Sequence, residues 1–355
     1  MSVIQGNDGK LKFIISANKN GPSGRIMSLG EYIEMLNDDY TAGVMINNKA
    51  QVSTPDIMGS FVRLSDNGFG IILGNEFNPL VYRGLNNDLC FMPTSLRYEL
   101  FDGNERIRHS IERMKKQEFI SLISRTAYCT RSKTFEVYGN KYRLDPESIA
   151  KLYNFVSDCI DVTRDILVAY FYAYTYIDKE KNQVMPVKDF SYHSPTLYVG
   201  NLRRIYNELP QTMANMSFQP FVRAKVQQSM SLNTAENYNR LKELFIKVDL
   251  PKNPDIAEYI YNRFDGGKAL FPGDFAARTA VKIRNDKILQ INLFKQYCDE
   301  TNTDAKWLRE QLIKLGYEFD YSPRTLTEDD EYMINREIDE IIIPYIDSQI
   351  KLRTI

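Results

Sequence analysis

The stretch that most constrains the fold is a run of apolar and aromatic residues at positions 166–176. As a helix it would be apolar on nearly every side, so it must be buried inside a sizeable core. Asp161-Val-Thr163 leads into this run, and we expect Thr163 to cap the helix, with Asp165 near its positive end. Such a helix end can bind phosphate or a polar ligand group. The simpler alternative is a capped core helix with no ligand.

A second stretch, Leu80–Leu85, reads Leu-Val-Tyr-Arg-Gly-Leu. It predicts a short buried strand whose end holds a cation, Arg83. Because arginine keeps its charge at ordinary pH, burying it requires an anionic or acceptor-rich partner. Gly84 would allow a sharp turn or the close approach of a ligand. The alternative is a strand end with a surface arginine.

Composition limits the classes of function. The chain has 355 residues with 43% hydrophobic content, enough for one large domain with an appendage or for two domains. Its net charge of -1 gives no support for nucleic-acid or anionic-membrane binding. Four scattered cysteines and two histidines argue against a metal site. With no signal-like start and no long apolar segment, we expect a cytoplasmic protein without membrane contact.

The order of segments predicts three parts. Residues 1–26 form an N-terminal lead-in segment, residues 27–285 the main domain, and residues 286–355 a helical C-terminal appendage. In the appendage, residues 306–315 have a helical pattern that stops at Gly316, and an acidic turn at residues 327–331 begins a last helix. We expect these helices to pack on the main domain, on a protein partner or on a second copy of the chain.

Several motifs in this order resemble the FRG domain, a family named for its Phe/Tyr-Arg-Gly motif. They are a Ser28-Leu-Gly-Glu-Tyr helix start, Tyr82-Arg83-Gly84, Pro93-Thr-Ser-Leu-Arg, Asp161-Val-Thr163 with Leu-Val-Ala-x-Phe-Tyr-Ala, Arg223-Ala-Lys-Val-Gln227-Gln, and Leu270-Phe-Pro-Gly-Asp. The resemblance covers about residues 27–285. Two family elements differ: the His-Tyr-Gly-Leu-Pro-Thr-Arg run reads Leu-Tyr-Asn-Phe-Val-Ser-Asp at residues 152–158, and Gln-x-Gly-x-Phe reads Gln-Gln-Ser-Met-Ser from Gln227.

FRG domains are similar in plan to ADP-ribosyltransferases, which implies an α+β fold with a mixed sheet core and flanking helices. The resemblance implies NAD as the substrate, with no metal. Arg83 would bind phosphate, Thr163 would hydrogen-bond a ribose or amide, Asp161 would stabilise positive charge and Gln227 would orient the acceptor. The implied nucleotide site comprises the residues Tyr82, Arg83, Gly84, Thr163 and Phe171, in which the aromatic rings would stack on a base.

Two hypotheses follow, and both stay open. The first is an NAD-consuming effector, an ADP-ribosyltransferase or NAD glycohydrolase, with a role in antiviral defence against phage. The second is a non-catalytic nucleotide-sensing or protein-interaction module. The neutral Gln227 favours the second, because breaking the glycosidic bond of NAD develops positive charge that a carboxylate stabilises, and Asp161 is the one candidate for that role. Nucleic-acid binding through the basic run at residues 106–116 is a third reading, which the net charge disfavours.

Overall fold

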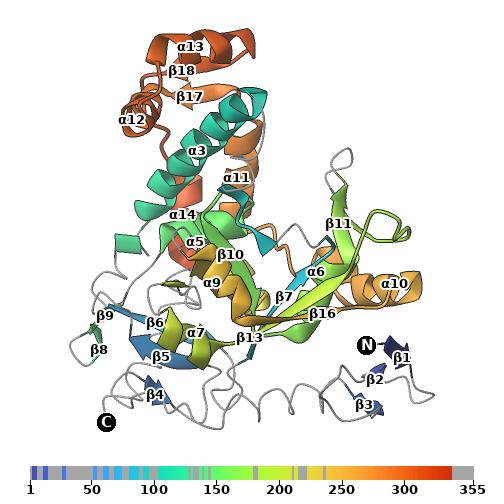
Figure 1. The fold of residues 1–355 in the computed structure, drawn as a ribbon. Coiled ribbons are helices and arrows are strands. Elements are labelled where there is room, and N and C mark those ends of the chain that lie inside the picture. Colours follow the sequence, from blue (N-terminus) through green and yellow to red (C-terminus); the bar gives the residue numbers. More distant parts are fainter. Residues whose placement is uncertain are drawn as a thin grey trace.

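The structure is a computed structural model that describes most of the chain between residues 80 and 337 (Figure 1). Within that span, the residues not described are 88–90, 96–102, 127–128, 131–135, 138–139, 143–144, 179–182, 210–211, 215–221 and 235–236. Before residue 80 the structure describes the backbone of strands β1–β6. Apart from Ser28, which ends strand β3 (Ile26–Ser28), the expected helix start at residues 28–31 lies outside the described residues.

The predicted strand Leu80–Leu85 is confirmed as β7, which lies inside a six-stranded sheet of order β14-β15-β10-β7-β13-β16. Every neighbouring pair of its strands is antiparallel, whereas we expected a mixed sheet. The α+β class holds. The mixed sheet was implied by the resemblance alone, because the apolar pattern of a strand reports which face is buried and says nothing of the strand's direction. The bounds are β10 (Cys159–Thr163), β13 (Thr196–Asn201), β14 (Met213–Ala214), β15 (Ser229–Asn233) and β16 (Phe245–Asp249).

Helices cover both faces of this sheet, since successive side chains of a strand point to opposite sides. Leu80 and Tyr82 of β7 share a buried cluster with α6 and α10, and Val81 and Leu85 share another with α7 and α9. The predicted buried helix at residues 166–176 is confirmed as α6, which ends two residues early where strand β11 begins. The bounds are α6 (Ile166–Tyr174), α7 (Leu202–Glu208), α9 (Tyr238–Glu243), α10 (Pro254–Arg263) and the hairpin strands β11 (Thr175–Asp178) and β12 (Gln183–Pro186).

Gly84 allows α6 to approach β7 very closely. A Cβ atom at this position would lie 1.6 Å from the carbonyl oxygen of Ala169 in the helix. The sharp turn that we expected at Gly84 is absent, because the residue lies inside the strand and pairs with Leu197 of β13. The close approach of a ligand, the other expectation, stays a prediction. The missing side chain is needed for strand-to-helix packing.

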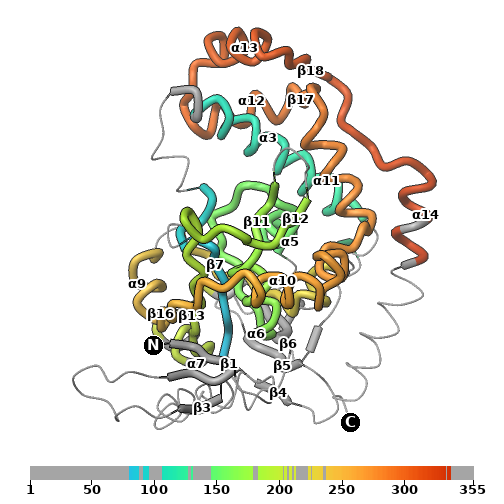
Figure 2. The backbone as a smooth tube through the Cα atoms, turned by 90° about the vertical axis from the view of Figure 1, so that its right-hand side faces the viewer, coloured from blue at the N-terminus to red at the C-terminus, as the bar shows by residue number. Residues whose placement is uncertain are grey.

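The long helix α3 (Gly103–Ser124) joins the main domain to the C-terminal part of the chain (Figures 1 and 2). One end of its apolar stripe packs with α5, α8 and α11, and the other packs with α12 and α13. The remaining bounds are α5 (Pro146–Leu152), α8 (Val222–Val226), η3 (Asp265–Gly267), α11 (Phe275–Asn285), α12 (Ile291–Thr301), α13 (Ala305–Lys314) and α14 (Glu328–Glu337).

Within the described residues 286–337 of the predicted appendage, helices predominate, and β17 (Ile288–Gln290) and β18 (Glu318–Asp320) form a two-stranded parallel sheet. The appendage packs against α3 and leaves Trp307, Ile313 and Leu315 exposed. An association of these helices with a partner therefore stays a prediction.

Two further sheets involve the N-terminal half of the chain. A three-stranded antiparallel sheet joins β1, β2 and β3, and a five-stranded sheet of order β4-β5-β6-β9-β8 contains one parallel pair, β6 with β9. The bounds are β1 (Ser2–Gln5), β2 (Leu11–Ile14), β4 (Gln51–Ser53), β5 (Gly59–Arg63), β6 (Gly68–Leu73), β8 (Glu136–Val137) and β9 (Asn140–Tyr142). Within the described residues, none of the helices combines the length and the apolar character that crossing a membrane requires.

Candidate functional site

A cavity of about 540 Å³ is lined by β7, β10, α6 and the hairpin β11–β12. This volume lies within the range of roughly 300–1,000 Å³ that is usual for small-molecule sites. The structure places all seven residues that the sequence suggested for a site in the lining of this cavity: Tyr82, Arg83, Gly84, Asp161, Thr163, Phe171 and Gln227. Two stretches about eighty residues apart therefore meet at one place, while the chemical role of each residue stays a prediction.

Arg83 is fixed at the junction of two strands. In the described residues β7 and β10 share one register pair, Tyr82 with Thr163. Next to this pair, Nη1 of Arg83 donates a 2.5 Å hydrogen bond to the backbone carbonyl oxygen of Asp161. This bond satisfies a strand carbonyl and also holds the guanidinium against the cavity wall.

The carboxylate of Asp161 has two neighbours. Its Oδ1 accepts a 3.0 Å hydrogen bond from the hydroxyl of Ser231, which lies opposite it on β15. Its Oδ2 lies 3.8 Å from Nζ of Lys151, at the end of α5. Asp161 supplies the single carboxylate in the described lining, against the two cations Arg83 and Lys151. The lining therefore carries a net positive charge, and its one acid is already close to a lysine.

We expected Thr163 to cap α6, but it does not. The N-cap is Asp165, whose Oδ1 accepts a 2.8 Å hydrogen bond from the Leu167 N–H. The Thr163 hydroxyl donates to the carbonyl oxygen of Gln227 at 2.7 Å and accepts from the Asp165 N–H at 2.9 Å. The prediction failed because Thr163 is still a strand residue. A hydroxyl used twice by the backbone has little capacity left for a ribose or an amide.

Gln227 links two chain segments. It is only 3% exposed, and its Nε2 donates a 2.7 Å hydrogen bond to the carbonyl oxygen of Leu270. It follows α8 directly and precedes β15. This bond ties the strand connection to the segment before α11, so Gln227 has a clear structural role in addition to lining the cavity.

The aromatic walls differ in how much ring surface they offer. Phe171 is fully buried, and its ring lies 5.4 Å from that of Phe264 and 6.2 Å from that of Phe271, so it supports the wall from behind. Tyr82 is buried as well. Tyr172, in contrast, is 36% exposed and contacts Phe271 edge-on, with ring centroids 6.2 Å apart. Tyr172 is therefore the better-placed ring for stacking on a base.

The phenol of Tyr172 lies in the field of the charged residues around the cavity. Desolvation raises its pKa, and the nearby Asp161 carboxylate raises it further, whereas Arg223 and Arg83 act in the opposite direction. The hydroxyl therefore stays protonated at neutral pH and can donate a hydrogen bond to a ligand.

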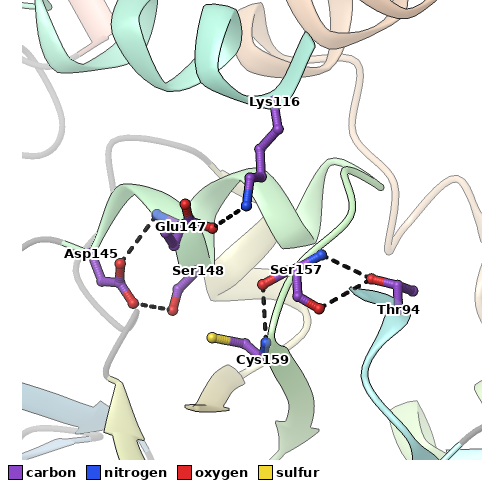
Figure 3. A network of polar contacts seen from close by, with 7 residues as sticks. All are labelled: Thr94, Lys116, Asp145, Glu147, Ser148, Ser157 and Cys159. Atoms are coloured by element: carbon purple, nitrogen blue, oxygen red, sulfur yellow. Dashed lines mark hydrogen bonds and ion pairs between the residues drawn. The ribbon is translucent and has the colours of Figure 1, made fainter. Parts of the chain in front are cut away.

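A polar network positions the elements that carry Lys151 and Asp161 (Figure 3). Lys116 of α3 bonds Oε2 of Glu147 at 2.8 Å, which fixes the first turn of α5. Asp145 caps the same helix by accepting from the Glu147 N–H. Ser157 accepts from the Cys159 N–H at the start of β10, and its own N–H bonds the hydroxyl of Thr94. Lys151 and Asp161 therefore project from well-anchored elements.

Sequence reasoning missed three residues of the site: Lys151, Tyr172 and Ser231. Tyr172 was part of the predicted buried helix, but its exposure could not be read from a pattern that is apolar on every side. Ser231 could have been found by placing its strand opposite Asp161, and Lys151 only from the packing of α5. Within the described residues, no group of histidines, cysteines and acids gathers in a way that could hold a metal ion.

The cavity thus combines two cations, one paired carboxylate, polar amides and hydroxyls, and an accessible tyrosine. Such a set suits a ligand with anionic groups and a planar ring. The similarity to FRG domains rests on the motifs given above. No family model matches this chain, and it has no match among the curated proteins or the solved structures.

Proposed function

We propose that the cavity binds a nucleotide of the NAD type. The observation that carries this proposal is the meeting of Arg83 and Lys151 with the exposed ring of Tyr172 in one cavity of ligand size. A fixed guanidinium is well suited to a phosphate, since its planar fork of donors matches the phosphate oxygens. Tyr172 offers a ring face for an adenine or nicotinamide and a hydroxyl donor for the sugar.

The FRG-type, ADP-ribosyltransferase-like plan is part of the same proposal. It is supported by the order of the motifs and by an α+β core in which an arginine strand lies beside the strand that leads into a buried helix. A role in defence against phage belongs to this plan and rests on the resemblance alone.

Turnover of NAD is a second candidate function, and the position of Asp161 in the cavity favours it. In hydrolysis, the bond between ribose C1′ and nicotinamide nitrogen breaks, nicotinamide leaves with the electron pair, and water adds to the oxocarbenium carbon with loss of a proton. Asp161 is the group in the described lining that can stabilise the developing positive charge. Its ion pair with Lys151 and the neutral Gln227 make binding the better-supported of the two functions.

The test is calorimetric titration of the full chain with NAD and ADP-ribose, with chromatography of NAD after incubation. Replacing Arg83 with alanine should weaken binding about tenfold or more, because a charge-assisted hydrogen bond contributes roughly 1.5–3 kcal/mol. Circular dichroism should show that the variant is still folded. Arg278→Ala is the matched control, since Arg278 also donates to a backbone carbonyl, that of Gly273 at 2.7 Å, but is exposed and does not line the cavity.

The outcomes separate the functions. Binding without nicotinamide release supports a sensor, and release that is lost in Asp161→Asn supports an enzyme. Failure of the wild-type chain to bind either ligand, or equal affinities of wild type and Arg83→Ala, would refute the proposal.

A further inference from the structure

Arg223 is a buried cation for which the described residues provide no acidic partner. It lies in α8 and is only 7% exposed. Its Nη1 donates a 2.7 Å hydrogen bond to the carbonyl oxygen of Leu152, whereas its Nε has no hydrogen-bond partner among the described residues. Burying a charge without an opposite charge costs several kcal/mol. A cation kept in such a place is one that an anion could neutralise.

Arg223 lies directly behind the lining of the cavity and is not itself among the lining residues. The guanidinium carbon lies 5.3 Å from the ring centroid of Phe271 and 4.4 Å from that of Tyr153. Phe271 and Leu152, which contact Arg223 directly, both line the cavity. Tyr172 lines it too, and its phenol senses the charges of both Arg223 and Arg83. The two arginines therefore lie near the same tyrosine.

We propose that Arg223 is a second phosphate-binding residue of this cavity and that the ligand carries two linked phosphates, as in a nucleoside diphosphate or its sugar conjugate. The inference rests on the proposed function and specifies the class of ligand. Arg83 and Lys151 in the lining, with Arg223 directly behind it, outnumber the one lining carboxylate, Asp161, and a pyrophosphate supplies the negative charge that this excess requires. A single phosphate would balance Arg83 and leave Arg223 without an anion.

Arg223 also has a structural role, which the experiment must separate from ligand binding. Its bond to Leu152 satisfies a carbonyl at the C-terminus of α5, where a cation is favourable. If this role were the whole explanation, removing Arg223 would weaken the binding of every ligand of the cavity by a similar factor. If Arg223 binds phosphate, the loss should depend on the number of phosphates.

The test is calorimetric titration of the full chain with AMP, ADP and ADP-ribose for the wild type, Arg223→Met and Arg223→Lys. In the wild type, ADP and ADP-ribose should bind about tenfold or more tightly than AMP. In Arg223→Met this preference should fall to about twofold, and Arg223→Lys should keep part of it because the charge remains. Arg309→Met is the matched control, since Arg309 also lies 5.3 Å from a phenylalanine ring, that of Phe319.

The preference is the ratio of the dissociation constants for AMP and ADP, both measured on the same variant. A partly unfolded sample therefore does not distort it. An unchanged ratio in Arg223→Met, or a wild type that binds AMP as tightly as ADP, would overturn this inference while leaving nucleotide binding intact. A wild type that binds none of the three ligands would overturn the proposed function and, with it, this inference.

Discussion

Gly84→Ala should destabilise the chain strongly, because the added methyl group meets backbone atoms of α6. The Cβ atom would lie 1.6 Å from the carbonyl oxygen of Ala169, 2.5 Å from its carbonyl carbon and 2.9 Å from the amide nitrogen of Ala173. Backbone atoms of a buried helix cannot rotate away as the end of a side chain can. The helix as a whole must therefore move off β7, or the strand must bend.

The expected loss of stability follows from the distance between the added Cβ atom and the carbonyl oxygen of Ala169. Ordinary contact begins at 3.4 Å, so about 1.8 Å of movement is needed at a place where the helix is packed on both sides. Overpacking a core usually costs about 1–3 kcal/mol, and this clash belongs at or above the upper end of that range. We expect a loss of about 3 kcal/mol or more in the free energy of unfolding, measured by urea denaturation with circular dichroism.

Two other glycines give a graded comparison. A Cβ at Gly273 would have no atom within 4 Å, so Gly273→Ala should change stability by less than about 0.5 kcal/mol. A Cβ at Gly200 would lie 2.6 Å from the ring of Phe245, and Gly200→Ala should fall between the two. If Gly84→Ala is no more destabilising than Gly273→Ala, the close packing of α6 on β7 is not as described.

Two further predictions concern α3. Burial, together with the charges of Arg113 and Lys116, lowers the pKa of His109 to about 4, so the folded protein favours the neutral imidazole. The stability that comes from burying His109 in its neutral form is fully present above the ordinary pKa of about 6.5. It is lost as the pH falls toward 4, because the unfolded chain binds the proton first. His109→Gln should therefore reduce the loss of stability between pH 7 and pH 5 by about 1 kcal/mol, allowing for partial exposure, and equal pH profiles in denaturation would contradict this. Arg324→Met leaves the buried Glu118 without its ion pair and should cost about 3 kcal/mol; the fluorescence of Trp307, the chain's one tryptophan, should then show the appendage unfolding before the core seen by circular dichroism.

Local signals in the sequence predicted much of the fold. The apolar and aromatic start of Leu80–Leu85 predicted β7, and the all-round apolar run after Asp165 predicted α6. Gly316 predicted the stop after α13, and its φ is +79°. The pair Asp145-Pro146 carries the N-cap and N1 residues that are typical of a helix start, and α5 begins there. These features depend on residues close together in the chain, which is why sequence patterns can report them.

The features that sequence reasoning could not supply depend on tertiary packing. Residues 159–163 were expected to lead directly into α6, with Thr163 as its cap. They form strand β10 instead, and the cap is Asp165 because the strand continues through Thr163. The neighbours of Asp161 come from α5 and β15, which lie far from one another in the chain. Only the packed structure shows that this carboxylate is paired.

That pairing decides how binding and chemistry can be connected in this cavity. Because Nζ of Lys151 lies 3.8 Å from its Oδ2, the Asp161 carboxylate stabilises an oxocarbenium ion less than an unpaired carboxylate would. A bound phosphate competes for the same lysine. If NAD is turned over, we expect its phosphates to draw Lys151 away from Asp161 as NAD binds, so that the carboxylate is free when the glycosidic bond breaks. If NAD is bound and not turned over, Lys151 is simply a further cation for the phosphates. Under either hypothesis, Lys151 determines how strongly Asp161 can act.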